Sequence, residues 1–191
     1  ERLALELQNE GHQVKIYSFT LQYPNFLFPG KTQYTEEAAP KTLQITSLVN
    51  SVNPLNWFRV GKRLRKEKPD LIIFRYWLPF FGPAFGTIAK IAKKNQHTKV
   101  ISILDNVIPH EKRIGDQLFT KYYLSKIDAF IAMSHSVLND LRTFIPKPNA
   151  VFSPHPVYDN FGPAYPKSTA LAALDIPNHD KIILFFGFIR K

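Results

Sequence analysis

Apolar and polar positions alternate along the chain with two periods, which predicts strands and helices in turn. Short runs rich in β-branched and aromatic residues predict strands at residues 14–19, 43–48, 71–76, 99–104, 129–133 and 150–153. Apolar residues three or four positions apart predict helices at residues 54–68, 84–95, 116–126 and 134–144. Asn53 followed by Pro54 marks one helix start, and Ser134 or Ser136 marks another. The chain opens in a further helical segment, which Gly11 ends as a helix C-cap does.

Strands that alternate with helices at this spacing predict a doubly wound α/β domain, a Rossmann-like parallel sheet with helices on both faces. We assign residues 1–153 to this domain and residues 154–167, which hold four prolines and a glycine, to a linker. A short helix at 168–176 and an apolar strand at 181–186 then restart the pattern, so residues 168–191 are expected to begin a second domain. With no initiator Met and a buried-type strand at the very end, both ends look cut and the chain is expected to be a fragment.

Composition narrows the class of protein. The 191 residues are 45% hydrophobic, enough for one full core, and no apolar run reaches the roughly 18 residues that a membrane-spanning helix needs. The chain has no cysteine, which excludes disulfides and thiolate metal sites and is compatible with a reducing compartment. We therefore expect a cytoplasmic protein.

The net charge of +10 points to anionic partners: phosphates, nucleic acid or an acidic lipid surface. Much of the excess lies at the C-terminal ends of two predicted helices, where cations complement the helix dipole and form a solvated face. That interpretation is favoured over a dedicated anion site. The cations concerned are Lys62, Arg63, Arg65, Lys66 and Lys68 in one helix and Lys90, Lys93 and Lys94 in the other.

Four stretches, in this order, resemble the retaining glycosyltransferases of family 4 ("glycosyl transferases group 1"), which have the two-domain GT-B architecture. They are residues 1–14 (ERLALELQNEGHQV), 106–111 (NVIPHE), 128–141 (DAFIAMSHSVLNDL), and 153–162 (SPHPVYDNFG) leading to 185–191 (FFGFIRK). The resemblance implies an N-terminal acceptor-binding domain plus the first strand of a donor-binding domain. It also implies sugar transfer from a nucleotide-sugar donor to a glycan or lipid-linked acceptor in polysaccharide biosynthesis.

The same resemblance implies that this fragment alone is inactive and that the enzyme works at the inner face of the membrane, in peripheral contact with anionic lipid. Two positions depart from the family pattern. Phe188 follows Gly187, where members usually have an arginine, so Arg190 is the counterpart expected to hold the donor diphosphate. Many relatives also have a histidine where this chain has Asp105, before Asn106.

Ligands of parallel α/β sheets gather at the carboxyl ends of the strands, which draws attention to two loops. In the loop after residue 104, His110 is the catalytic candidate, because imidazole titrates near neutrality and can relay a proton. The alternative is a loop histidine bonded to backbone. Asp105, Asn106 and Glu111 of the same loop are assigned to acceptor binding.

Around the start of the loop after residue 76, Arg75, Tyr76 and Trp77 are assigned to the acceptor, since a cation and rings suit phosphates and sugar faces. For Phe80, Phe81 and Phe85 we favour a packing role under the following helix. Residues 23–30 suit either an acceptor-facing flap or a plug over the sheet edge.

No pair of histidines has metal-ligand spacing, so we predict no metal and no cofactor beyond the nucleotide-sugar substrate. Three other functions stay open: a sugar-nucleotide epimerase of the GT-B fold, a non-enzymatic Rossmann-like binding domain, and a nucleic-acid-binding module. The glycosyltransferase is preferred, with no nucleic acid among its expected partners.

Overall fold

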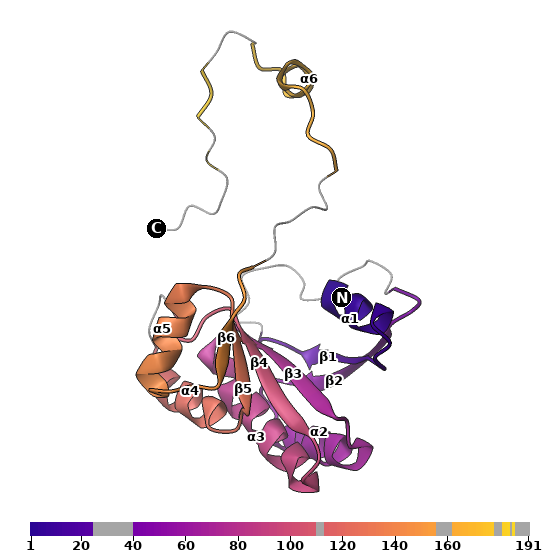
Figure 1. Cartoon of the computed structure of the whole chain (residues 1–191), viewed down its shortest axis with the longest axis vertical. Coiled ribbons are helices and arrows are strands. Elements are labelled where there is room, and N and C mark those ends of the chain that lie inside the picture. The colour runs from indigo at the N-terminus through magenta and orange to yellow at the C-terminus, as the bar shows by residue number, and fades with distance from the viewer. Residues whose placement is uncertain (25–39, 110–112, 156–161, 178–180, 184, 186–191) are drawn as a thin grey trace. The chain divides into compact units, whose positions relative to one another are not determined.

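The computed structural model describes residues 1–24, 40–109, 113–155, 162–177, 181–183 and 185. The chain forms two compact units, Glu1–His155 and Pro156–Lys191. Figure 1 shows strands and helices alternating along the first unit, as the sequence predicts.

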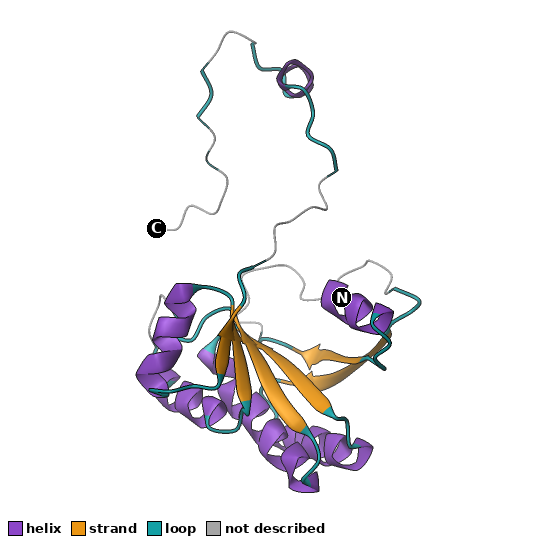
Figure 2. Cartoon of the chain, in the orientation of Figure 1, coloured by secondary structure: helices purple, strands orange, loops and turns teal. Residues whose placement is uncertain are grey.

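All described strand pairs are parallel, which confirms the α/β class. One pair consists of β1 (Lys15–Leu21) and β2 (Gln44–Asn50). The other four strands form a sheet in the order β3-β4-β5-β6. Figure 1 labels these strands, and Figure 2 shows them in orange, side by side. Their bounds are Leu71–Tyr76, Lys99–Leu104, Ala129–Ala132 and Ala150–Phe152.

Among the described residues, the β1–β2 pair and the four-stranded sheet are not hydrogen-bonded to each other, although the sequence suggests one sheet. Side chains join them instead. Phe19 of β1 and Phe74 of β3 both pack on Phe85, with ring centroids 6.1 and 4.8 Å away. The two sets of strands therefore share one apolar layer.

Helices flank these strands. Figure 1 shows α1 (Arg2–Asn9) on one side of the β1–β2 pair and α2 (Pro54–Glu67) on the other. Next to α2 lie α3 (Gly82–Ala92), which follows the 3-10 turn η2 (Pro79–Phe81) and leads into η3 (Lys93–Asn95), and then α4 (Asp116–Leu124). The last helix of the unit is α5 (His135–Phe144). Together these elements form a Rossmann-like α/β domain.

Local sequence signals set the helix ends. Gly11 lies at a φ of +91° after α1; its N–H donates to Gln8 O, while that of His12 donates to Leu7 O. These two bonds make a Schellman cap, which glycine adopts at little cost. Asn53 caps α2 by accepting from the N–H of Asn56, and Ser134 caps α5 by accepting from that of Val137. The three predicted helix-end signals are thus confirmed.

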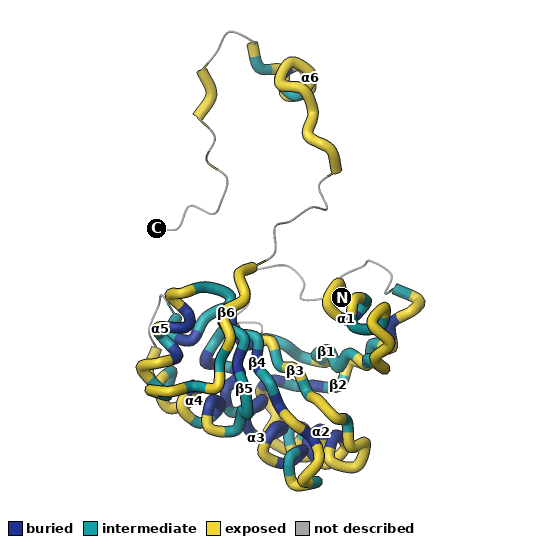
Figure 3. Tube along the Cα trace, viewed as in Figure 1, coloured by how far each residue is buried: buried dark blue, intermediate teal, exposed yellow. Residues whose placement is uncertain are grey.

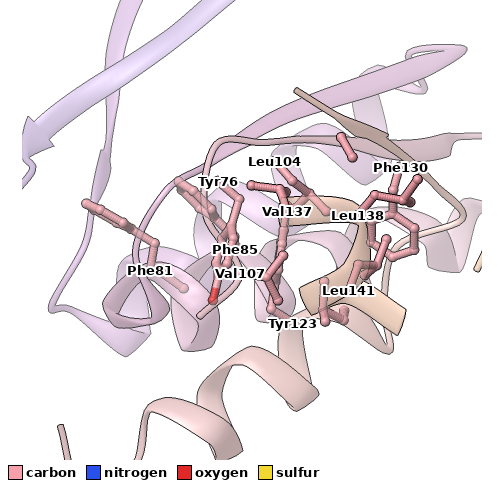
Figure 4. Packing of buried hydrophobic residues seen from close by; sticks show 13 residues of the cluster. Tyr76, Phe81, Phe85, Leu104, Val107, Tyr123, Phe130, Val137, Leu138 and Leu141 are labelled. Atoms are coloured by element: carbon pink, nitrogen blue, oxygen red, sulfur yellow. The ribbon is translucent and has the colours of Figure 1, made fainter. Parts of the chain in front are cut away.

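The main core lies between the four-stranded sheet and the helices on one of its faces. Figure 4 shows aromatic side chains at its centre. Tyr76 stacks on Tyr123 at 4.3 Å and Phe81 stacks on Phe85 at 5.4 Å. The packing role favoured for Phe81 and Phe85 is confirmed, since both rings are buried.

The second unit contains α6 (Lys167–Ala173), whose Leu171 is buried. The strand predicted at residues 181–186 is not found in the described part of that segment. Residues 181–183 and 185 are in no strand, and Ile183 is 98% exposed. A strand needs a neighbour to pair its backbone groups, and no described strand of this unit offers one.

Candidate functional site

The carboxyl ends of β3 and β4 lie side by side, so the two loops singled out in the sequence begin at the same edge of the sheet. The strands pair in register up to Tyr76 and Leu104. One step further, the N–H of Asp105 donates to the carbonyl oxygen of Tyr76 over 2.9 Å. This bond fixes the start of one loop against the end of the neighbouring strand.

Arg75 and Asp105 form a two-pronged ion pair at this edge. The Nε–H of Arg75 donates to Asp105 Oδ2 over 2.7 Å, and Nη2–H donates to Oδ1 over 3.1 Å. The Arg75 side chain is 60% exposed and that of Asp105 is 21% exposed, so the pair is open to solvent on the arginine side. A fork of this kind holds both planar groups in one orientation. The structure brings together two residues that the sequence assigned to acceptor binding.

Trp77 extends the site with an indole ring. Its Nε1–H donates to the hydroxyl oxygen of Tyr23 over 2.7 Å, which joins the end of β3 to the segment after β1. The Tyr23 ring lies against Phe80 and Phe81, at 6.0 and 5.3 Å, and burial raises the pKa of its hydroxyl. For Tyr23 this packing supports the plug interpretation; residues 25–30 of that segment lie outside the described residues.

The acceptor-binding role predicted for Tyr76 is wrong for its side chain. Tyr76 is fully buried, as Figure 4 shows, and its hydroxyl shares a hydrogen bond of 3.1 Å with Thr120 Oγ1. Burial raises the pKa of this hydroxyl above its ordinary value. The Tyr76 side chain packs against α4, where its hydroxyl is paired with Thr120. It therefore supports the end of β3 from the core, and its buried atoms cannot reach a ligand at the surface.

Four predicted residues remain. Asn106 is half-buried directly after Asp105, at the mouth of the same loop. His110, Glu111 and Arg190 lie outside the described residues, so their assignments stay predictions from sequence.

Sequence reasoning missed two partners in this region. Tyr23 enters the sequence prediction only as part of the segment 23–30, which follows a predicted strand by a few residues, and Thr120 does not enter it. A helical period places Thr120 on the buried side of α4 with Tyr123 and Leu124, and this was the signal available for it.

Two other described histidines have partners outside the Arg75–Asp105 pair. His97 pairs with Asp70 over 2.8 Å at the opposite, amino end of β3 and β4. His135 stacks on Phe152 with ring centroids 4.0 Å apart. Within the described ranges, no three His, Asp or Glu side chains converge as a metal would require. No described helix is both long and apolar enough to cross a membrane.

A comparison with family models decides the affiliation. The model for Glycosyltransferase Family 4 matches residues 1–158, which is most of the chain and includes every described residue of the candidate site. The chain belongs to glycosyltransferase family 4. No curated protein matches it.

Membership in this family indicates the general class of reaction that the protein catalyses. The protein is a glycosyltransferase, and its Rossmann-like unit is the N-terminal domain of a GT-B fold. A transferase of this kind acts on a sugar donor and an acceptor. The Arg75–Asp105 pair and the Trp77 indole lie at the carboxyl ends of β3 and β4, the kind of edge where ligands of parallel α/β sheets gather.

Proposed function

We propose that this chain is the acceptor-binding part of an enzyme that moves a sugar from a nucleotide-sugar donor to a hydroxyl of a glycan or lipid-linked acceptor, with retention of anomeric configuration. The observation that carries the proposal is the Arg75–Asp105 ion pair beside Trp77 at the carboxyl ends of β3 and β4. A carboxylate accepts from sugar hydroxyls, a guanidinium binds phosphate or hydroxyl oxygens, and an indole packs on the apolar face of a pyranose.

The ion pair has a specific task in this proposal. Arg75 holds the Asp105 carboxylate in a fixed plane. The hydroxyl of the sugar acceptor therefore finds a carboxylate already positioned to accept its hydrogen bond when it binds. A positioned hydrogen-bonding group contributes on the order of 10²-fold to turnover. In a solvent-exposed pair the same contact contributes only about 0–1 kcal/mol to folding. Activity is therefore the property that reports on this role.

The reaction is tested on the complete polypeptide that the gene encodes. The purified protein is incubated with UDP-, GDP-, ADP- and dTDP-sugars, each with short oligosaccharides or polyprenyl-linked sugars, and products are read by mass spectrometry. A gain of one sugar on an acceptor is expected, and NMR of the new linkage shows whether the anomeric configuration is retained. Conversion of the donor sugar with no gain on any acceptor would instead indicate an epimerase, and binding without turnover would indicate a binding domain.

A matched pair of variants tests the site. Asp105→Asn keeps the shape of the side chain but removes its charge, and we expect the acceptor kcat/KM to fall by about 10²-fold with the donor KM unchanged. The control is Glu67→Gln, because Glu67 accepts from Arg63 Nε over the same 2.7 Å but lies at the end of α2. If Asp105→Asn turns over the acceptor as well as the control does, the pair is structural and the proposed site is wrong.

His110 is proposed as a second group, on sequence grounds alone. It comes shortly after Asp105 and Asn106 in the loop at the end of β4. His110→Ala is expected to lower turnover by about 10²-fold and to change stability by less than about 0.5 kcal/mol. Near-normal turnover would remove His110 from the mechanism and leave the Arg75–Asp105 pair. Arg190 is likewise the sequence-based candidate for contact with the donor diphosphate.

A further inference from the structure

Two exposed rings stack on each other at the carboxyl ends of β5 and β6. His135 is the first residue of α5, directly after β5 and its cap, and Phe152 is the last residue of β6. Their ring centroids lie 4.0 Å apart, and the ring planes are 22° from parallel. Both residues are exposed, and Figure 3 shows exposed positions on β6 but none on β5 beside it. We call this pair the ring platform.

The ring platform lies at the same edge of the sheet as the Arg75–Asp105 pair. Asp105 directly follows β4, and the platform lies at the ends of the next two strands. Those two ends are tied together, because the N–H of Ser153 donates to the carbonyl oxygen of Ala132 over 3.0 Å. Neighbouring strands lie about 4.8 Å apart, so β4 and β6 are separated by about 10 Å. A ligand that contacts both places must therefore be longer than one sugar ring and run across the edge of the sheet.

The platform is preformed because the backbone under both rings is held in place. Ser134 caps the first turn of α5 by accepting from the N–H of Val137 over 3.1 Å, and α5 is anchored by the buried side chains of Val137, Leu138 and Leu141. Strand β6 pairs in register with β5 up to Phe152. A ligand therefore finds the rings in position, which lowers the entropy cost of binding.

Packing alone does not account for this arrangement. Phe152 is 41% exposed even with the imidazole stacked on it, whereas Phe130 on the neighbouring strand is 4% exposed. An imidazole is a polar ring and therefore a poor cover for a phenyl ring. The two ring nitrogens of His135 have no hydrogen-bond partner among the residues that the structure describes, whereas His97 is held by Asp70. The platform thus offers an apolar surface together with polar atoms that are free to bind.

We propose that the ring platform binds a second sugar of an oligosaccharide acceptor. The apolar face of a pyranose packs on the exposed rings, and its hydroxyls exchange hydrogen bonds with the imidazole, in which one nitrogen donates and the other accepts. The sugar that receives the new linkage lies at Asp105, and the rest of the acceptor runs across the edge of the sheet to β6.

This inference rests on the proposed function and deepens it, because it selects a glycan chain of more than one sugar as the acceptor. The base of a nucleotide donor is the competing ligand, since bases also stack on rings. The acceptor is preferred because this chain is proposed to be the acceptor-binding part of the enzyme. Nucleotide binding is therefore measured as a separate outcome.

The first test measures how transfer by the complete polypeptide depends on acceptor length. The acceptor identified by mass spectrometry is prepared with one, two, three and four sugars, and kcat/KM is compared. We expect kcat/KM to rise about five- to tenfold, mainly through KM, once the acceptor is long enough to reach the platform. His135→Gln with Phe152→Leu removes both rings and keeps side chains of similar size. This variant should lose the gain with length and keep the kcat/KM of the shortest acceptor.

Matched controls remove one ring of each kind elsewhere. Phe58→Leu acts at a phenylalanine of α2 that is 51% exposed, and His97→Gln acts at a half-exposed histidine at the amino end of the sheet. Both controls should keep the length dependence of the unchanged protein. If the platform variant also keeps it, or if it loses activity equally with acceptors of every length, the proposal is overturned.

The second test needs no donor and no transfer, so its failure is separate from a failure of the transferase proposal. Malto-, cello- and chitooligosaccharides of two and four units are titrated into the complete polypeptide, and the imidazole signals are followed by NMR. The signal of His135, assigned with His135→Gln, should shift with the four-unit sugars of at least one series. The shift should be absent in Phe152→Leu and retained in Phe58→Leu.

Two results of this titration would contradict the proposal. If none of the oligosaccharides shifts the His135 signal, the platform binds no sugar. If UDP, GDP, ADP or dTDP shifts it and Phe152→Leu abolishes that shift, the platform serves the donor nucleotide instead of the acceptor.

Discussion

Helices α2 and α3 lie against each other and use their apolar residues in opposite ways. Helix α3 is buried over most of its length, and Lys90 is its one exposed residue. Helix α2 buries only a narrow side, with Val60, Gly61 and Leu64, and exposes leucine, phenylalanine and cations on the other. The contrast follows from position, since α3 is packed between α2 and α4 while α2 has a neighbouring helix on one side only.

The comparison separates two uses of a side chain. In α3 a change of one methyl group alters packing, because its glycines approach neighbouring helices closely and the interior is close-packed. On the exposed side of α2 several whole side chains can change with little effect on folding.

The largest loss of stability is expected from Gly82→Ala at the start of α3. A Cβ there would lie 2.5 Å from the carbonyl oxygen of Phe119, a backbone atom of α4 that cannot move aside. We expect the free energy of unfolding to fall by about 2–4 kcal/mol, measured by urea denaturation. Gly86→Ala is the comparison, because its Cβ would meet the ring of Tyr122 at 2.7 Å and a side chain can shift. A Gly82→Ala protein no less stable than Gly86→Ala would show that the two helices are loosely packed.

The next largest loss of stability is expected at high pH, where two buried tyrosine hydroxyls of the core come under pressure to ionise. Burial raises the pKa of both the Tyr76 and Tyr123 hydroxyls above the unfolded value of 10.0. A raised pKa means that the folded state keeps the proton, so this stability is complete below pH 10 and is lost as pH rises toward the folded pKa values. The loss is about 1.4 kcal/mol per pH unit for each tyrosine. Urea denaturation at a series of alkaline pH values measures it.

A double variant isolates the contribution of these two tyrosines. In Tyr76→Phe with Tyr123→Phe, the free energy of unfolding should fall less steeply above pH 10, by about 1.4 kcal/mol per pH unit for each tyrosine replaced. Tyr165→Phe, at an exposed tyrosine, is the control and should leave the slope unchanged. An equal slope in the double variant would mean that neither buried hydroxyl governs the alkaline transition.

A smaller loss is expected from Tyr123→Phe alone at neutral pH. The Tyr123 hydroxyl donates to Ser102 Oγ over 2.7 Å, and both residues are fully buried. Removing the donor leaves the serine oxygen without this partner, which costs about 1–2 kcal/mol. Adding Ser102→Ala should recover part of the loss, since both polar groups are then gone. Thermal and urea unfolding of the three variants measure it, and no recovery in the double variant would point to ring packing instead.

The sequence predicted the elements of this domain well, because the signals for them are local. The spacing of apolar residues, together with Gly11, Asn53 and Ser134, depends on neighbours a few positions away, and the structure has helix ends at each of the three. The parallel sheet followed from the alternation of strands and helices. These features need no knowledge of long-range contacts.

What could not be predicted depends on how distant strands align. Arg75 meets Asp105 because β3 and β4 pair in one register, and no local pattern sets that register. Tyr76 is instructive in another way. It lies on the same face of β3 as Ile72 and Phe74, so the two-residue period of a strand indicated burial, whereas its place before a loop suggested exposure. The strand period was the better guide.

The smallest effect on stability is expected on the exposed side of α2. Combining Leu55→Ser, Phe58→Ser, Lys62→Gln and Lys66→Gln should change the free energy of unfolding by no more than about 0.5–1 kcal/mol, because exposed side chains contribute little to the folded state. Urea denaturation measures this change beside that of Gly82→Ala. If the combined variant loses as much stability as Gly82→Ala, its side chains pack on something within the domain. In that case α2 would resemble α3 after all.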